Sequence, residues 1–161
     1  MPRSTKRSEL RRWIEQRSVG RIGEREFAQL QSALTPISES YLRRLLRDCG
    51  VPLDPMVEGV RQGSFDELQE SLDRLLTIYE SGDAARKRAV RGMVITAKDH
   101  ARLAARSPGA SPEKRSEKEE MVLWLLTWLE NPGVFPEWAR LRRAAWEKEA
   151  GGWEHRPTSE E

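Results

Sequence analysis

The sequence is poor in the residues that build metal sites, disulfides and many catalytic centres. Among its 161 residues, Cys49 is the only cysteine, and His100 and His155 are the only histidines. One cysteine excludes an internal disulfide and any zinc site made of a cysteine cluster, and two distant histidines lack metal-ligand spacing. The motifs GxGxxG, GxxxxGK[ST], GxSxG and HExxH are also missing. We therefore expect no metal and no cofactor, and an enzyme would need a site assembled from dispersed residues.

Long apolar runs are missing as well. The longest, residues 121–129, spans nine positions even when Thr127 is counted, whereas a membrane-spanning helix needs about 20. The amino terminus is basic but leads into no apolar stretch, so it lacks the central region of a secretory signal. These features predict no membrane association and a cytoplasmic location.

Helix-forming patterns dominate what is present. Apolar residues recur three and four positions apart, and β-branched residues are sparse beside Leu, Ala, Arg and Glu. The pattern predicts an all-α, single-domain bundle of about seven or eight helices around one core. The predicted parts of this domain, residues 1–161, are an N-terminal three-helix unit at 8–50, a central antiparallel helical hairpin at 64–106, a mobile loop at 107–115, a tryptophan-rich helix pair at 116–150 and a frayed tail at 151–161.

Capping and breaking residues set the expected helix ends. Ser64 with Glu67, and Ser116 with Glu119, have the spacing of capping boxes, and Gly82 breaks the central hairpin. The expected helices span 8–18, 24–34, 38–49, a short segment from Asp54-Pro55 that ends by Gly63, 64–81, 84–106, a segment from 116 that stops at Asn131-Pro132-Gly133, and 136–149. The helix that begins at 116 is apolar nearly all round, which predicts the central buried helix of the bundle.

Charge is balanced in total and uneven along the chain. The formal net charge is +2, but successive segments alternate in sign: +6 for 1–47, −7 for 48–83, +7 for 84–115 and −4 for 116–161. The sixth expected helix carries a basic stripe about 27 Å long, and the fifth carries an acidic one. We expect the two stripes to pair with each other or to face solvent, with phosphate binding by the basic stripe as the alternative. The basic stripe is Arg88, Arg91, Lys98, Arg102 and Arg106, and the acidic stripe is Asp66, Glu70, Asp73 and Glu80.

The segment SESYLRRLLRDCG follows the short turn Thr35-Pro36-Ile37, and together they resemble the turn and second helix of a helix-turn-helix module. The resemblance covers about 45 residues and departs from the usual pattern at Pro36, where glycine is common. It implies that the helix at 38–49 would lie in the major groove. A three-helix packing unit without a DNA role explains the same residues. The implied nucleic-acid contacts are Ser38, Ser40, Arg43, Arg44 and Arg47, with Glu39 also on the exposed face.

Aromatic residues gather near the carboxyl end. Trp138, Arg142 and Trp146 lie on one side of the last helix and have the composition of protein contacts, although a core between the last two helices explains the tryptophans equally. His100 and Cys49 are interpreted as structural. The leading hypothesis is a non-catalytic protein–protein interaction or self-association module that uses Trp138, Arg142 and Trp146. The alternative is a DNA-binding or transcription-associated protein, and a dispersed-site enzyme comes third.

Overall fold

A computed structural model describes residues 5–159, with side chains described up to residue 149. Helices account for all of its regular structure, so the all-α prediction is confirmed. Within the described residues the only strand-like feature is an isolated parallel bridge between Ile22 and Leu53. The helices are α1 (Lys6–Arg17), α2 (Glu24–Ala33), α3 (Glu39–Asp48), α4 (Pro55–Glu58), α5 (Phe65–Ser81), α6 (Ala84–Ala105), α7 (Pro112–Glu130) and α8 (Phe135–Ser159).

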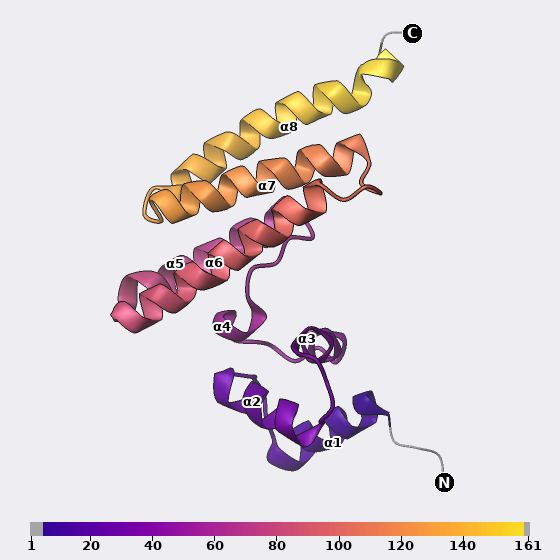
Figure 1. Cartoon of the computed structure of the whole chain (residues 1–161), viewed down its shortest axis with the longest axis vertical. Helices are drawn as coiled ribbons and strands as arrows, with labels where there is room; N and C mark the ends of the chain where they lie inside the picture. The colour runs from indigo at the N-terminus through magenta and orange to yellow at the C-terminus, as the bar shows by residue number, and fades with distance from the viewer. Residues whose placement is uncertain (1–4, 160–161) are drawn as a thin grey trace. The chain divides into compact units, whose positions relative to one another are not determined.

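The chain forms two compact units rather than the single unit around one core that the sequence suggests. The N-terminal unit ends at Gly59 and the C-terminal unit begins at Val60. The physical reason is the segment between α4 and α5, which is short of apolar residues and joins elements that each bury their own apolar stripe. Figure 1 shows α1–α4 and α5–α8 as the helices of these two units.

In the N-terminal unit three helices and a short fourth enclose one apolar cluster. The loop before α2 is fixed by main-chain bonds: the Ile22 amide donates to the Pro52 carbonyl, and the Asp54 amide donates to the Ile22 carbonyl, both at 2.9 Å. Ser38 begins α3 as its N-cap, and its hydroxyl accepts from the Tyr41 amide. The predicted three-helix unit therefore exists, completed by α4. Its buried members are Leu10, Trp13, Ile22, Phe27, Leu30, Leu34, Leu42, Leu45, Leu46, Leu53 and Val57.

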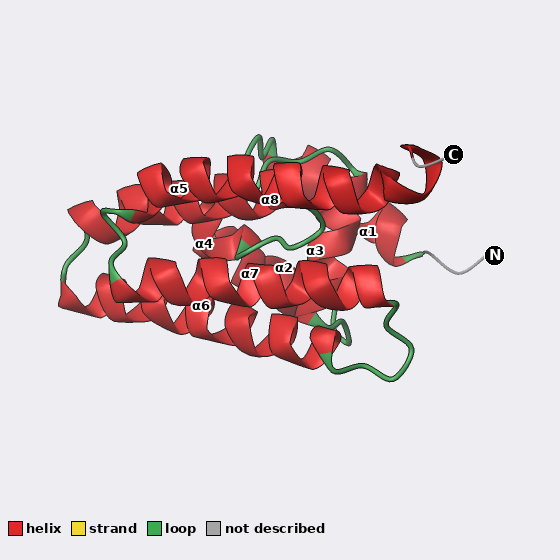
Figure 2. Cartoon of the chain, turned by 90° about the horizontal axis from the view of Figure 1, so that it is seen from above, coloured by secondary structure: helices red, strands yellow, loops and turns green. Residues whose placement is uncertain are grey.

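The C-terminal unit is a four-helix bundle in which α6 packs against α5 and α7, and α8 packs against α5 and α7. Seen from above, α5 and α8 lie on one side of this unit and α6 and α7 on the other (Figure 2). The Ser64 hydroxyl caps α5 by accepting from the Glu67 amide, and Asp83 caps α6 directly after the turn at Gly82. The predicted antiparallel hairpin of α5 and α6 is confirmed.

The start of α7 differs from the prediction. Ser111, not Ser116, is the N-cap, and its hydroxyl accepts from the Lys114 amide at 3.1 Å. Pro112 occupies the first helical turn, where its missing N–H costs nothing. Ser116 then lies inside the helix, so the predicted 107–115 loop is shorter and ends at Ser111.

The last two helices also depart from expectation. Helix α7 contacts α5, α6 and α8, yet it is not buried all round, since Leu123 and Leu126 remain about 40% exposed. Helix α8 continues to Ser159, past the predicted end at 149, and residues 160–161 of the predicted frayed tail lie outside the described residues. None of the described helices combines the length and the apolar character needed to cross a bilayer.

Candidate functional site

The predicted protein-contact residues of α8 take part in contacts inside the C-terminal unit. Trp138 lies edge-on to Trp124, with ring centroids 6.2 Å apart, and Trp146 lies 5.7 Å from the Phe65 ring. Both tryptophans are half-buried. The exposed aromatic surface expected at these positions is therefore not formed, because α8 turns this stripe toward α5 and α7. A role for them in protein contacts stays a prediction.

Arg142 is held by a buried carboxylate on α7. Its Nε and Nη2 donate to the two oxygens of Glu120 at 2.6 and 2.7 Å, and the indole nitrogen of Trp124 donates to the same carboxylate at 3.0 Å. The side chain of Glu120 is only 5% exposed. The hydrogen bond to Glu120 raises the pKa of Arg142 above its usual value, so this guanidinium stays charged. This pair ties α7 to α8, and a role for Arg142 in protein contacts stays a prediction.

The acidic stripe of α5 is used by neighbours other than α6. Asp66 pairs with Arg143 of α8, and the hydrogen bond and charge of this guanidinium hold the pKa of Asp66 below its usual value. Glu70 pairs with Arg74 within α5. Desolvation raises the pKa of Asp73. Within the described residues, no ion pair joins the acidic stripe of α5 to the basic stripe of α6.

Among the described residues, two members of the basic stripe have partners and three do not. Arg91 donates to the Leu129 carbonyl near the end of α7 at 2.9 Å, where a cation complements the helix dipole. Lys98 lies 3.5 Å from the Asp99 carboxylate. Arg88, Arg102 and Arg106 are exposed and have no hydrogen-bond or ion-pair partner for their guanidinium groups in the described part of the chain. The stripe thus keeps free cations at both of its ends.

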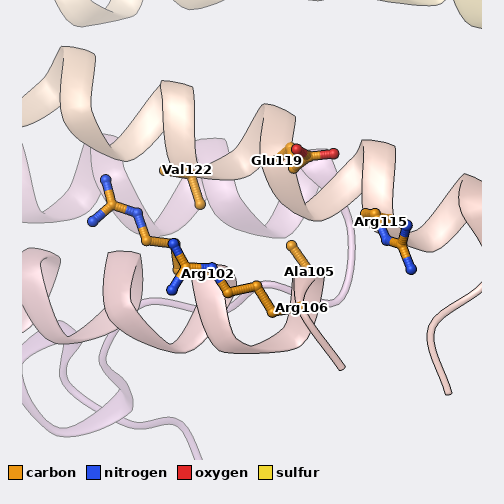
Figure 3. A pocket seen from close by; sticks show the side chains of 6 residues that line it. All are labelled: Arg102, Ala105, Arg106, Arg115, Glu119 and Val122. Atoms are coloured by element: carbon orange, nitrogen blue, oxygen red, sulfur yellow. The ribbon is translucent and has the colours of Figure 1, made fainter. Parts of the chain in front are cut away.

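A hollow of about 530 Å³ lies at the α6–α7 junction, at the carboxyl end of the stripe (Figure 3). Figure 3 shows the side chains of Arg102 and Arg106 extending along α6, with Arg115 on the first turns of α7. Arg115 is also exposed and has no side-chain partner among the described residues. The residues that line the hollow are Arg102, Ala105 and Arg106 of α6, and Arg115, Glu119 and Val122 of α7.

Arg115 is not among the residues that the sequence predicts for a site, because the sequence predicts a loop at 107–115. The dipeptide Ser111-Pro112 contains the signal that would have found it, since a capping serine followed by proline marks a helix start in the same way as Asp54-Pro55. A helix that begins at 112 brings Arg115 and Glu119 onto one face, one turn apart.

An apolar patch interrupts the basic stripe at its middle. Arg91 reaches Leu129, whereas Arg102 and Val122 line one hollow, so the antiparallel register places Ile95 level with Leu126. Ile95 is 40% exposed and Leu126 is 39% exposed, with Leu123 on the next turn of α7 at 41%. We call this surface the outer α6–α7 face. It comprises Arg88, Arg91, Ile95, Lys98, Arg102 and Arg106 of α6 and Arg115, Glu119, Leu123 and Leu126 of α7.

The N-terminal unit gives less support to a groove-reading helix. Arg43 is half-buried: its Nε donates to the Val57 carbonyl at 2.8 Å and its guanidinium lies over the Phe27 ring. Its predicted exposed position is therefore wrong, because α4 and α2 enclose it. Arg44 lies over the Tyr41 ring, and the hydroxyl of Ser38 is used in the cap. Ser40, Arg44 and Arg47 are exposed, and their nucleic-acid role stays a prediction.

The remaining candidates for chemistry are separate from one another. His100 is exposed on α6. Cys49 is half-buried against the apolar cluster of the N-terminal unit. No group of three or more His, Cys, Asp or Glu residues gathers among the described side chains in a metal-binding arrangement.

The fold and this surface define the class: an all-α protein whose second unit is a four-helix bundle with a mixed basic and apolar face. Comparisons with protein-family models, curated proteins and solved structures find no match for the chain.

Proposed function

We propose that this chain is a non-catalytic protein–protein interaction module, and that the outer α6–α7 face binds an acidic segment of a partner protein. The observation that carries the proposal is an exposed apolar pair, Ile95 with Leu126. It lies between Arg88 at one end of the face and Arg102, Arg106 and Arg115 at the other, and these guanidinium groups have no partner among the described residues. Arginine around an apolar centre is the composition of protein interfaces. The contact role of Trp138, Arg142 and Trp146 stays a separate prediction; we propose this face instead because those three side chains make contacts inside the C-terminal unit.

The apolar pair supplies a modest driving force. Each side chain keeps about 40% of its surface in water, so covering it contributes roughly 1 kcal/mol, a corresponding share of the 1.5–3 kcal/mol for complete burial. Charge-assisted hydrogen bonds from Arg102 or Arg88 to carboxylates add selectivity and speed association. The expected partner is therefore bound transiently and is an amphipathic helix with acidic residues beside an apolar stripe.

The charge of the face favours a different partner over a second copy. A two-fold pairing of this face with itself would place the end that carries Arg88 against the end that carries Arg102, Arg106 and Arg115. Like charges that face one another across an interface are costly. Self-association through this face is thus the less favoured form of the same hypothesis.

The test uses a labelled amphipathic peptide with Leu at helical spacing and Glu at the flanking positions, and a control peptide with Lys in place of Glu. Fluorescence anisotropy with the full chain should show binding of the acidic peptide and much weaker binding of the basic one. The double variant Ile95→Gln, Leu126→Gln should weaken binding about tenfold, which is 1.4 kcal/mol. Leu141→Gln on α8, where the side chain is 57% exposed, is the matched control. Equal binding of both peptides, or equal loss in the control, would overturn the proposal.

DNA binding is the second candidate, and one observation favours it. Arg88, Arg102 and Arg106 lie along one helix without carboxylate partners from α5, as a contact to successive phosphates requires. A duplex would leave Ile95 and Leu126 uncovered, which is why this candidate ranks second. Its test is a gel shift with duplex DNA at about 50 mM salt, because counterion release makes phosphate contacts strongest at low salt. Absence of a shift there excludes it, whereas a shift without peptide binding would replace the leading proposal.

A further inference from the structure

We infer that the hollow between the end of α6 and the start of α7 is a binding site for the phosphoryl group of a phosphate monoester. It is lined by three arginines from two helices, and none of the three guanidinium groups has a protein partner in the described chain. The inference goes beyond the proposed function, because a small phosphorylated molecule can occupy the hollow whether or not a protein docks on the face.

Two of the arginines are placed by helical spacing. Arg102 and Arg106 are four positions apart in sequence, so their side chains leave α6 on one side, about 6 Å apart at Cβ. Figure 3 shows both side chains running along α6 beneath Val122 of α7. Two guanidinium groups at this spacing repel each other weakly in water, and an oxyanion between them removes the repulsion and accepts hydrogen bonds from both.

Arg115 supports an anion site independently of Arg102 and Arg106. Arg102 and Arg106 lie at the carboxyl end of α6, where cations are favourable for the helix dipole, so their presence there needs no ligand. Arg115 lies in the first turns of α7, where the dipole disfavours a cation. Glu113 in the first turn offsets part of this cost, but among the described side chains neither Glu113 nor Glu119 makes an ion pair with Arg115. A bound anion would offset the remainder.

The charge of the hollow selects a dianion. Three arginines and one glutamate leave two positive charges, which a phosphate monoester neutralises at pH 7, whereas a carboxylate neutralises only one. A phosphoryl group also offers three acceptor oxygens. Arg102 and Arg106 run along α6 in Figure 3, whereas Arg115 extends the other way and would turn toward the hollow to complete the contact. Ala105 and Val122 form an apolar part of the wall, and the hollow is larger than a phosphoryl group, so the remainder of the ligand has room.

The experiment titrates the full chain with inorganic phosphate, phosphoserine and acetate and follows the arginine Nε–H signals by NMR. Phosphoserine should shift the signals of Arg102, Arg106 and Arg115 and bind at least tenfold more tightly than acetate. Arg115→Gln should weaken phosphoserine binding about tenfold. Arg88→Gln is the matched control, since it removes the same charge from the same stripe but does not line the hollow.

Glu119→Gln keeps the shape of the hollow and removes its negative charge, so it should tighten phosphoserine binding about threefold. Equal loss of affinity in Arg88→Gln and Arg115→Gln would overturn the site in favour of diffuse surface charge, as would equal affinity for phosphoserine and acetate. A peptide that carries phosphoserine distinguishes the source of the ligand. Tenfold tighter binding of the peptide than of phosphoserine indicates a phosphorylated protein, and equal binding indicates a small molecule. If the full chain binds the acidic peptide but does not bind phosphoserine, this phosphate site is refuted and the proposed function is unaffected.

Discussion

Replacing Arg142 by Met should destabilise the C-terminal unit more than any change at an exposed ion pair. The substitution keeps most of the apolar stem of the side chain and removes both hydrogen bonds to Glu120, at 2.6 and 2.7 Å. The carboxylate is then left 5% exposed, and among the described side chains only the Trp124 indole still donates to it.

The magnitude follows from burial. Breaking a fully buried ion pair by removing one partner costs about 3–5 kcal/mol, because the remaining charge stays desolvated. The side chain of Arg142 is 29% exposed, so water can reach the vacated position and replace part of the lost interaction. We therefore expect a loss of about 2–3 kcal/mol in the free energy of unfolding. Glu120→Gln in the same chain should recover part of it, since the amide carries no charge to desolvate.

The assay is urea unfolding at pH 7 followed by tryptophan fluorescence. Five of the six tryptophans belong to the C-terminal unit in sequence, so this signal reports mainly on the bundle. Arg140→Met is the matched control, because Arg140 pairs with Glu137 on the exposed side of α8 and both side chains are about 65% exposed; no measurable change is expected there. A loss below about 1 kcal/mol in Arg142→Met, or strict additivity with Glu120→Gln, would refute the reasoning.

Three further predictions test other parts of the fold. Ser111→Ala should destabilise the bundle by about 1 kcal/mol and Ser116→Ala by much less, as unfolding curves would show, because only Ser111 caps α7; the reverse order would restore the later helix start. Leu46→Ala should cost about 2–5 kcal/mol and raise amide hydrogen exchange in the N-terminal unit without raising it in α5–α8, whereas exchange that rises equally in both units would contradict separate cores. The carboxyl of Asp66 should titrate below the usual aspartate pKa in an NMR titration and return to it in Arg143→Gln. Since this pKa is lowered in the folded state, the contribution of the pair is present above the unfolded-state pKa and is lost as the pH falls through the folded-state pKa; an unchanged midpoint in Arg143→Gln would exclude the pair as the cause.

Much of the helical layout could be predicted because its determinants are local. Ser38, Ser64 and Asp83 are caps that act on amides three residues away, and each begins a helix where expected. The predicted start of α7 was wrong because two local signals for a helix start lie close together. The earlier one, Ser111-Pro112, sets the start, since no residue between it and Ser116 breaks a helix.

The candidate site was predicted in part. Arg88, Arg102 and Arg106 were selected by their helical spacing, which depends on one element only. Arg115 and the apolar pair Ile95 with Leu126 were not selected, because their place on the face depends on the register of α6 against α7. The spacing of residues within one helix does not predict how that helix is aligned with its neighbour.

The sequence by itself determined that this protein is helical, where most of its helices begin, and that its near-zero net charge conceals blocks of opposite sign. These properties depend on main-chain capping, side-chain periodicity and composition. Only the tertiary structure decided which charges meet. Asp66 faces Arg143 of α8 instead of α6, and Glu120 of α7 holds Arg142 of α8 in an ion pair. The physical reason is that ion pairs act over a few ångströms, so helix packing decides which arginines of α6 and α7 remain free to bind something else.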